Sequence, residues 1–115
     1  MAVVYTAESR SLASLEVLVH AEDTQVLAAI KWAAVPVHID EPLIEIPHSL
    51  PDDWRQIPTP PSTRELGSRW VVETRSVALR VASAVVEGEF DYLLNPRHPN
   101  FARLEIGVPQ PFSEQ

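Results

Sequence analysis

Proline is frequent in this chain relative to glycine, and this balance limits the folds that are open to it. The 115 residues contain 11 prolines and 3 glycines. Each proline fixes its own φ angle, removes a backbone donor and pushes the preceding residue toward an extended conformation. Within sheets, proline is confined to edge strands and bulges. The sequence therefore predicts short strands and loops of fixed shape rather than long uninterrupted helices.

The composition is that of one folded domain of ordinary size. Hydrophobic residues make up 45% of the chain and charged residues 22%. This is enough apolar material for a core and too little charge for a disordered chain. We expect a single domain over residues 1–115. We interpret the proline-rich residues 58–62 as an internal connection, because neither flank is large enough to fold alone.

Charge and residue types argue against several classes of function. The formal net charge is -7 and Lys31 is the only lysine, so we expect no direct binding to nucleic acid. The absence of cysteine excludes disulfides and thiolate sites, which fits a cytoplasmic protein. The first residues, Met-Ala-Val-Val-Tyr, indicate neither a signal peptide nor a membrane span. No metal site is expected, because no ligand spacing links the four histidines, which are His20, His38, His48 and His98.

The hydrophobic pattern predicts a mixed α+β domain. Ser9 or Ser11 can cap one helix, and residues 62–65, Ser-Thr-Arg-Glu, form a capping box for a second. Pro36 indicates an edge or a bulge in its strand. We predict strands over residues 2–6, 33–39, 43–46, 78–86 and 103–108, and helices over residues 9–20 and 62–75.

The segment from Ser76 to Phe101 is the most informative part of the chain. It predicts a buried strand in which Ser83 lies among apolar residues. A hydroxyl group in such a place must find a partner or cost free energy. Ser83 is either a small core residue bonded to a neighbouring carbonyl or a residue of a functional site. No Gly-x-Ser-x-Gly motif surrounds it, which argues against a serine-hydrolase nucleophile.

Two further places could carry chemistry. Residues 95–100, Asn-Pro-Arg-His-Pro-Asn, form a preset polar loop in which Asn95 and His98 either contribute to a site or tie the turn together. Glu16 lies on or beside the apolar face of the predicted helix over residues 9–20. Its carboxylate either reaches water at the edge of that face or is held at the rim of a pocket, where it can stabilise developing positive charge.

The order of these pieces resembles the RES domain family, the toxin half of a bacterial toxin–antitoxin pair. Nearly the whole chain takes part in this resemblance. One local departure is Ala82, where the family pattern has proline before the serine. The matching segments are Val4-Tyr5-Thr6-Ala7 with residues 13–20, Leu50-Pro51-Asp52-Asp53-Trp54, Leu66-Gly67-Ser68-Arg69-Trp70, residues 79–86 and residues 95–99.

The resemblance implies a fold, a substrate and a partner. The fold would be a curved mixed sheet with flanking helices, similar to the ADP-ribosyltransferases. The activity would be NAD depletion by cleavage of the nicotinamide–ribose bond, by hydrolysis or phosphorolysis, with NAD as substrate and no cofactor. Carried over residue by residue, Tyr5 would stack on nicotinamide, Glu16 would stabilise the oxocarbenium-like state, and Ser83 would hydrogen-bond the ribose or the amide. The partner would be an Xre-type helix-turn-helix antitoxin.

The resemblance also implies that a family arginine, which clamps the pyrophosphate, lies upstream of the tyrosine strand. Here Tyr5 stands almost at the first residue of the chain. We therefore expect a RES domain shortened at its N-terminus and slightly at its C-terminus, with little NAD-degrading activity and with exposed apolar surface that favours a homo-oligomer. The alternative to the enzyme is a catalytically inactive, antitoxin-binding interaction protein. Protein ADP-ribosylation is a third reading that ranks below both.

Overall fold

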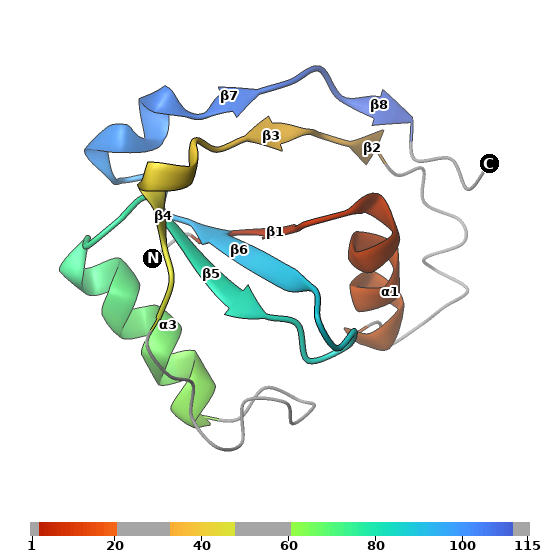
Figure 1. The fold of residues 1–115 in the computed structure, drawn as a ribbon, viewed down its shortest axis with the longest axis horizontal. Helices are drawn as coiled ribbons and strands as arrows, with labels where there is room; N and C mark the ends of the chain where they lie inside the picture. Colours follow the sequence, from red (N-terminus) through yellow and green to blue (C-terminus); the bar gives the residue numbers. More distant parts are fainter. Residues whose placement is uncertain (1–2, 21–32, 48–60, 112–115) are drawn as a thin grey trace.

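The computed structural model describes residues 3–20, 33–47 and 61–111, and these residues form a mixed α+β architecture (Figure 1). No helix among them is both long and apolar enough to cross a membrane. In chain order, the elements are β1 (Val4–Ala7), α1 (Arg10–His20), β2 (Ala33–Ala34), β3 (Val37–His38), the 3₁₀ helix η1 (Glu41–Leu43), β4 (Ile44–Glu45), α3 (Pro61–Glu73), β5 (Ala78–Ala82), β6 (Phe90–Leu94), the 3₁₀ helix η2 (Pro99–Arg103), β7 (Glu105–Ile106) and β8 (Gln110–Pro111).

A four-stranded mixed sheet is the centre of the fold. Its order is β1-β6-β5-β4. The strands β1, β6 and β5 pair antiparallel, whereas β4 runs parallel to β5. Figure 1 shows α1 beside the connection between β5 and β6, and α3 at the other side of the molecule. The sheet therefore brings the beginning of the described chain next to its last third.

The two faces of the sheet bury different parts of the chain. One face packs against α3 through a cluster of Trp70, Val71, Leu79 and Leu93. Leu79 and Leu93 are register partners, so they point to the same face. The next position along each strand, Ala78 and Leu94, belongs to the opposite face, together with side chains from residues 37–44 and 101–104. Alternation along β5 and β6 thus divides the core into two layers.

Local signals explain where α1 begins and where α3 begins and ends. The backbone N–H of Leu12 donates to Ser9 Oγ at 3.1 Å, so Ser9 is the N-cap of α1, as one of the two predicted alternatives requires. Helix α3 begins at Pro61, whose missing N–H costs nothing in the first turn. It ends at Glu73, and Thr74 takes a left-handed φ of 53°. The predicted helices over residues 9–20 and 62–75 are confirmed in type and within two residues in extent.

The predicted strand over residues 78–86 is too long, and β6 was missed altogether. Strand β5 ends at Ala82 because Ser83 Oγ accepts hydrogen bonds from the N–H groups of Val85 and Val86, which curls the chain into a turn. Gly88 completes this turn with a φ of 86°. The apolar Val85 and Val86 suggest a strand by composition, but the serine side chain diverts their backbone donors.

The predicted strand over residues 33–39 is broken into β2 and β3, whereas the predicted strand over residues 103–108 is reduced to β7, and β8 lies beyond it. β2 pairs with β8 and β3 with β7, both antiparallel, along the upper edge of Figure 1. Pro36 lies between β2 and β3, and its carbonyl oxygen accepts from Gly107 N–H at 2.7 Å. A Cβ at position 107 would lie 2.7 Å from Pro36 Cγ, so only glycine permits this approach. Pro36 therefore marks a break between strands rather than a residue within one.

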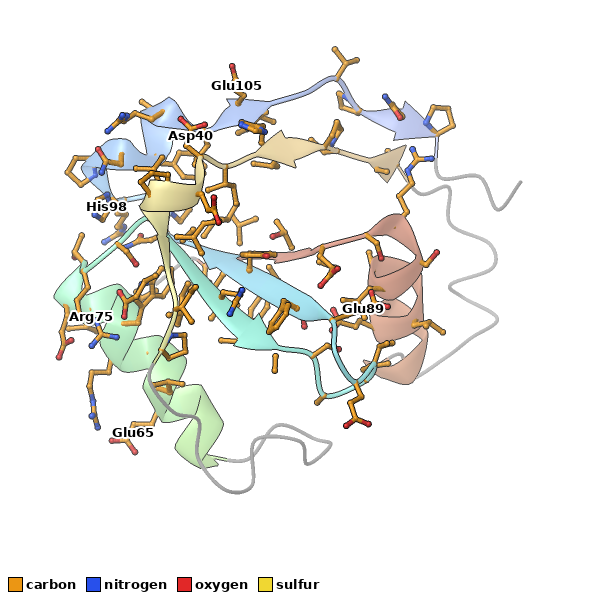
Figure 2. All side chains as sticks on the ribbon, viewed as in Figure 1. Asp40, Glu65, Arg75, Glu89, His98 and Glu105 are labelled. Carbon is orange, nitrogen blue, oxygen red and sulfur yellow. The ribbon has the colours of Figure 1, made fainter. Side chains whose placement is uncertain are left out.

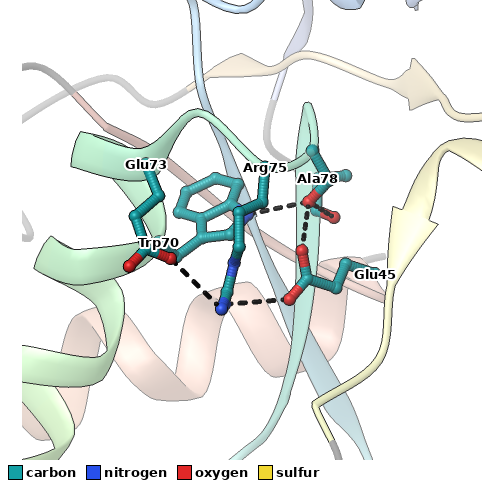
Figure 3. A network of polar contacts seen from close by, with 6 residues as sticks. Glu45, Trp70, Glu73, Arg75 and Ala78 are labelled. Carbon is teal, nitrogen blue, oxygen red and sulfur yellow. Dashed lines mark hydrogen bonds and ion pairs between the residues drawn. The ribbon is translucent and has the colours of Figure 1, made fainter.

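A polar network joins α3, β4 and the segment before β5, next to the apolar cluster that contains Trp70 (Figure 3). Trp70 is fully buried, and its indole N–H donates to Ser76 Oγ at 2.8 Å. The Ser76 hydroxyl lies 3.0 Å from Glu45 Oε1. Arg75 contacts Glu45 Oε2 at 2.9 Å and Glu73 Oε1 at 3.3 Å.

Replacing Ser76 by alanine should destabilise the fold, because the buried indole N–H of Trp70 loses its acceptor. We expect Ser76→Ala to lower the free energy of unfolding by about 1–3 kcal/mol. Urea unfolding followed by tryptophan fluorescence measures this loss. The control is Ser68→Ala at an exposed position of helix α3, which should stay within about 0.5 kcal/mol of the wild type. Equal stabilities of the two variants would contradict a stabilising role for this network.

Candidate active site

Helix α1 and the end of β5 bring Glu16 and Ser83 together. Ser83 Oγ donates to Glu16 Oε2 at 3.1 Å, although the two residues are 67 positions apart. Ser83 is 1% exposed, whereas Glu16 is half-buried. The Glu16 carboxylate is thus held by a hydrogen bond and is not only solvated. The buried hydroxyl and the carboxylate therefore form a joined pair.

The Ser83 hydroxyl group is fully engaged in this arrangement. It accepts from Val85 N–H at 3.0 Å and from Val86 N–H at 3.1 Å, and its proton is directed to Glu16. A hydroxyl group has one donor and two acceptor positions. The turn after β5 thus orients the serine, and the serine in turn orients Glu16. Any direct bond from Ser83 to a ligand requires the bond to Glu16 to be exchanged.

Asp91 is a third member of the site that the sequence analysis missed. It lies on β6, where its register partners are Ala7 on β1 and Val81 on β5. It is thus in phase with Leu93, which points into the core toward α3. An acidic residue in phase with a buried leucine could have been recognised from the sequence if β6 had been predicted as a strand. The missed strand therefore hid the missed residue.

Burial and acidic neighbours change the titration of Asp91. Burial, a hydrogen bond to Glu16 and repulsion from Glu16 and Glu8 raise the pKa of Asp91 from 3.8 to about 8. Asp91 Oδ1 is buried and meets no hydrogen-bond donor among the described residues. The two facts agree, because a proton on Asp91 turns the contact between two carboxyl groups into a hydrogen bond. Burial and the neighbouring carboxylates therefore favour the protonated form of Asp91.

A cleft runs along β1 and α1 and reaches this group of side chains. Its lining includes Tyr5, Glu8, Glu16, Val85 and Asp91. The side chain of Tyr5 is 76% exposed, so its ring is open to a ligand. Tyr5 is the register partner of Leu93 and therefore shares the face of the sheet on which Asp91 lies. The structure thus places Tyr5, Glu16 and Asp91 on one cleft, with Ser83 behind Glu16.

Among the described residues, two arginines near the cleft have contacts outside the Glu16 and Ser83 pair. Arg10, at the start of α1, donates to Gln110 Oε1 at 3.0 Å. The guanidinium of Arg80 lies 4.1 Å from the ring centre of Phe90. Glu8 Oε1 accepts from Phe90 N–H at 2.6 Å, which fixes a further negative charge near the site. The local field is therefore acidic, and it suits a developing positive charge better than a bound anion.

The loop that carries Asn95 and His98 lies away from this site. Asn95 N–H donates to Val77 O, at the end of β5 opposite to Ser83. Asn95 Oδ1 accepts from Arg97 N–H, and His98 Nδ1 accepts from Asn100 N–H, both at 3.0 Å. Figure 2 shows His98 at the far side of the molecule from Glu89, which lies next to α1. These two side chains are thus used to shape their own loop.

Other predicted positions are only partly visible. The turn around Leu50 to Trp54 and the residue His48 lie outside the described residues. Within the described ranges, no group of three or more histidine, aspartate or glutamate side chains is arranged to hold a metal ion. The side chains that the structure places at the site carry carboxyl, hydroxyl and phenol groups.

Substitution of Asp91 by asparagine should make the protein more stable at alkaline pH. Because the pKa of Asp91 is about 8 when folded and about 3.8 when unfolded, the folded state binds the proton more tightly. The stability due to this group is complete below about pH 4 and is lost as the pH rises to about 8. The melting temperature of Asp91→Asn should therefore exceed that of the wild type at about pH 9, and the difference should shrink toward about pH 4.

The control for this prediction is Glu87→Gln, which removes the same charge from an exposed position in the turn between β5 and β6. Its melting temperature should follow that of the wild type across the same range. A constant difference between Asp91→Asn and the wild type at all pH values would contradict the raised pKa.

Comparison with known proteins finds a matching family and several relatives. The model of the RES domain family matches residues 1–113. A protein named Toxin Res from Yersinia enterocolitica is 36% identical over 112 residues, which cover 97% of this chain and 73% of that protein. A Toxin Res from Photorhabdus laumondii is 38% identical, over 91% of this chain and 72% of that protein.

A relative with a different name also matches. A Prs ADP-ribosylating toxin from Sphingobium sp. is 33% identical over 105 residues, which cover 87% of this chain and 64% of that protein. The family match spans β1, α1 and the β5–β6 hairpin, the elements that carry Tyr5, Glu16, Ser83 and Asp91. With this match along nearly its whole length, the chain belongs to the RES domain family.

Proposed function

We propose that this chain is a toxin that depletes NAD by cleaving the bond between nicotinamide and ribose, on a sheet arranged like that of the ADP-ribosyltransferases. The observation that carries the proposal is the Glu16 carboxylate, held by the buried Ser83 hydroxyl at 3.1 Å on a cleft that also contains Tyr5. The names of the relatives support a toxic activity. NAD is then the substrate, and no cofactor takes part.

The proposed reaction needs a group that stabilises positive charge. When the C1′–N bond breaks, both electrons leave with the pyridinium nitrogen, so nicotinamide departs neutral and the ribose becomes an oxocarbenium ion. An oriented carboxylate beside C1′ stabilises that ion more than it stabilises the ground state. Water or phosphate then bonds to C1′ and gives up a proton to solvent. Glu16 fits the role of the stabilising group.

The remaining residues have roles in binding and orientation. The exposed Tyr5 ring offers a face on which nicotinamide can stack. Ser83 holds Glu16 and reaches the ribose or the amide only when that bond is exchanged. Asn95 and His98 shape their own loop and are assigned no contact with NAD.

Transfer of ADP-ribose to a protein is the second candidate. The name of the Sphingobium relative, an ADP-ribosylating toxin, favours it. Its first step is the same loss of nicotinamide, and only the nucleophile differs. Product analysis separates the three outcomes: free ADP-ribose indicates hydrolysis, phosphorylated ADP-ribose indicates phosphorolysis, and labelled protein indicates transfer.

The proposed biological setting is the bacterial cytoplasm, where an Xre-type helix-turn-helix antitoxin neutralises the chain. An inactive chain that only binds this antitoxin is the non-enzymatic alternative. The two are distinguished by mixing the chain with NAD and, separately, with the antitoxin. Binding of the antitoxin without any release of nicotinamide would favour the interaction protein.

Glu16→Gln should abolish most of the release of nicotinamide while leaving the fold intact. The amide keeps the shape and accepts from Ser83, but it lacks the negative charge that stabilises the oxocarbenium ion. We expect kcat to fall by about 10²–10³-fold, as for the loss of a comparable electrostatic contact. Chromatographic measurement of nicotinamide checks the rate, and thermal melting checks the fold.

The matched control for charge is Glu87→Gln, which should keep the rate of the wild type because Glu87 is exposed in a turn. Equal rates for Glu16→Gln and the wild type would overturn the assignment of Glu16. A wild-type chain that releases no nicotinamide would overturn the proposed activity itself.

Ser83→Ala should affect both stability and rate. The change leaves the N–H groups of Val85 and Val86 without their acceptor and frees the Glu16 carboxylate. We expect a loss of about 1–3 kcal/mol in the free energy of unfolding, together with a lower kcat. Melting curves and nicotinamide release at a temperature well below both midpoints separate the two effects. Unchanged stability would contradict the role of Ser83 in the turn.

A further inference from the structure

We propose that Asp91 is a positioning residue for Glu16: it remains protonated at neutral pH and donates its proton in a hydrogen bond to the Glu16 carboxylate. Glu16 is then held from two sides, by the Ser83 hydroxyl and by the Asp91 carboxylic acid, and the pair of carboxyl groups carries a single negative charge. The role of Asp91 in catalysis rests on the proposed function, whereas the proton shared between Asp91 and Glu16 does not depend on it.

Among the described residues, the buried Asp91 Oδ1 has no hydrogen-bond partner. Asp91 lies between Ala7 and Val81 in the middle of the sheet, on the face that continues into the buried Leu93. Glu16 and Asp91 line the same cleft, and Glu16 raises the pKa of Asp91 both as a hydrogen-bond partner and as a like charge. Two neighbouring carboxyl groups cannot both be charged without strong repulsion.

Among the described residues, the charges that act on Asp91 are negative, and they favour its neutral form. Glu8, after β1, and Glu16, on α1, both add negative charge near Asp91. Glu89, at the start of β6, accepts from Ser9 Oγ at 3.4 Å. Arg80 is the register partner of Tyr92, so it points to the opposite face, where its guanidinium covers Phe90. Arg10 is directed to Gln110. The described environment thus favours the neutral form of Asp91.

The consequence for the reaction is a defined charge and a defined orientation. With Asp91 protonated, Glu16 presents one fixed negative charge to the developing oxocarbenium ion. When Asp91 ionises, the donor is lost and Glu16 is repelled, so its orientation is no longer held from that side. No proton is transferred to substrate by Asp91, because its function is to hold a hydrogen bond through the reaction.

The first experiment needs no activity. Carboxyl carbon-13 resonances of the intact 115-residue chain are followed by NMR between about pH 4 and pH 10, and Asp91→Asn identifies the signal of Asp91. We expect the Asp91 carboxyl to titrate near pH 8. A midpoint near the ordinary value of 3.8 would overturn the proposal whatever the fate of the proposed function.

The second experiment measures the pH profile of nicotinamide release in three proteins. In the wild type, kcat should fall about tenfold as the pH rises through about 8, because the donor is lost. Asp91→Asn keeps a neutral N–H donor, so it should retain the rate of the wild type at pH 7 and lose the alkaline decline. Asp91→Ala has no donor and should be about tenfold slower throughout, with KM little changed.

The pattern of these results decides between catalytic and structural roles. Rescue by asparagine but not by alanine, with loss of the alkaline decline, supports the positioning role. Equal defects in both variants, or an alkaline decline that persists in Asp91→Asn, would overturn it. Absence of nicotinamide release from all proteins, with an Asp91 carboxyl that still titrates near pH 8, would overturn the proposed activity but support the shared proton.

Discussion

The pairing of β5 with β6 is the constraint on which the rest of the structure depends. Five register pairs join these two central strands, and each strand provides one further edge, on which β1 and β4 add to the sheet. The faces of this hairpin carry the residues around which both core layers form. Its closing turn contains Ser83, and its second strand begins with Phe90, which Asp91 follows. Core and site are therefore built on the same two strands.

The proposed role of Glu16 requires two properties that usually oppose each other. The carboxylate must keep its negative charge to stabilise a positive transition state, yet it must be fixed in position. A cation bound to a carboxylate orients it but also neutralises it. Neutral donors solve this problem, because a hydroxyl group and a carboxylic acid orient the carboxylate without cancelling its charge. Ser83 provides the first of these donors, and Asp91 is proposed to provide the second.

Sequence reasoning recovered the parts of this protein that depend on local signals. The cap at Ser9 and the helix from the proline-rich segment to Glu73 follow from patterns within a few residues. The predicted strand around Pro36 was too long and β8 was missed, because the breaks on both sides arise from a contact between Pro36 and Gly107. The meeting of Glu16 with Ser83 was anticipated through the family resemblance and not through any property of the separate residues.

Because β6 was not predicted, one residue of the candidate site could not be predicted either. Val85 and Val86 have the composition of a strand, and only the side chain of Ser83 turns their backbone away from it. Placing the strand too early hid the alternation of Asp91 with Leu93, which marks an acid that faces inward. The raised pKa of Asp91 depends on three segments that meet only in the folded chain, and no window of sequence contains them.

The order of strands in the sheet also determines when this site can exist. Hydrogen bonds that close it span 67, 82 and 86 residues, because β1 and α1 must wait for β5 and β6. Contacts of such long sequence separation are slow to form, since the entropy of closing a long loop is lost before the contact is gained. During synthesis, Tyr5 and Glu16 leave the ribosome long before their partners. The residues of the candidate site can therefore come together only after β5 and β6 have been translated and the sheet has closed.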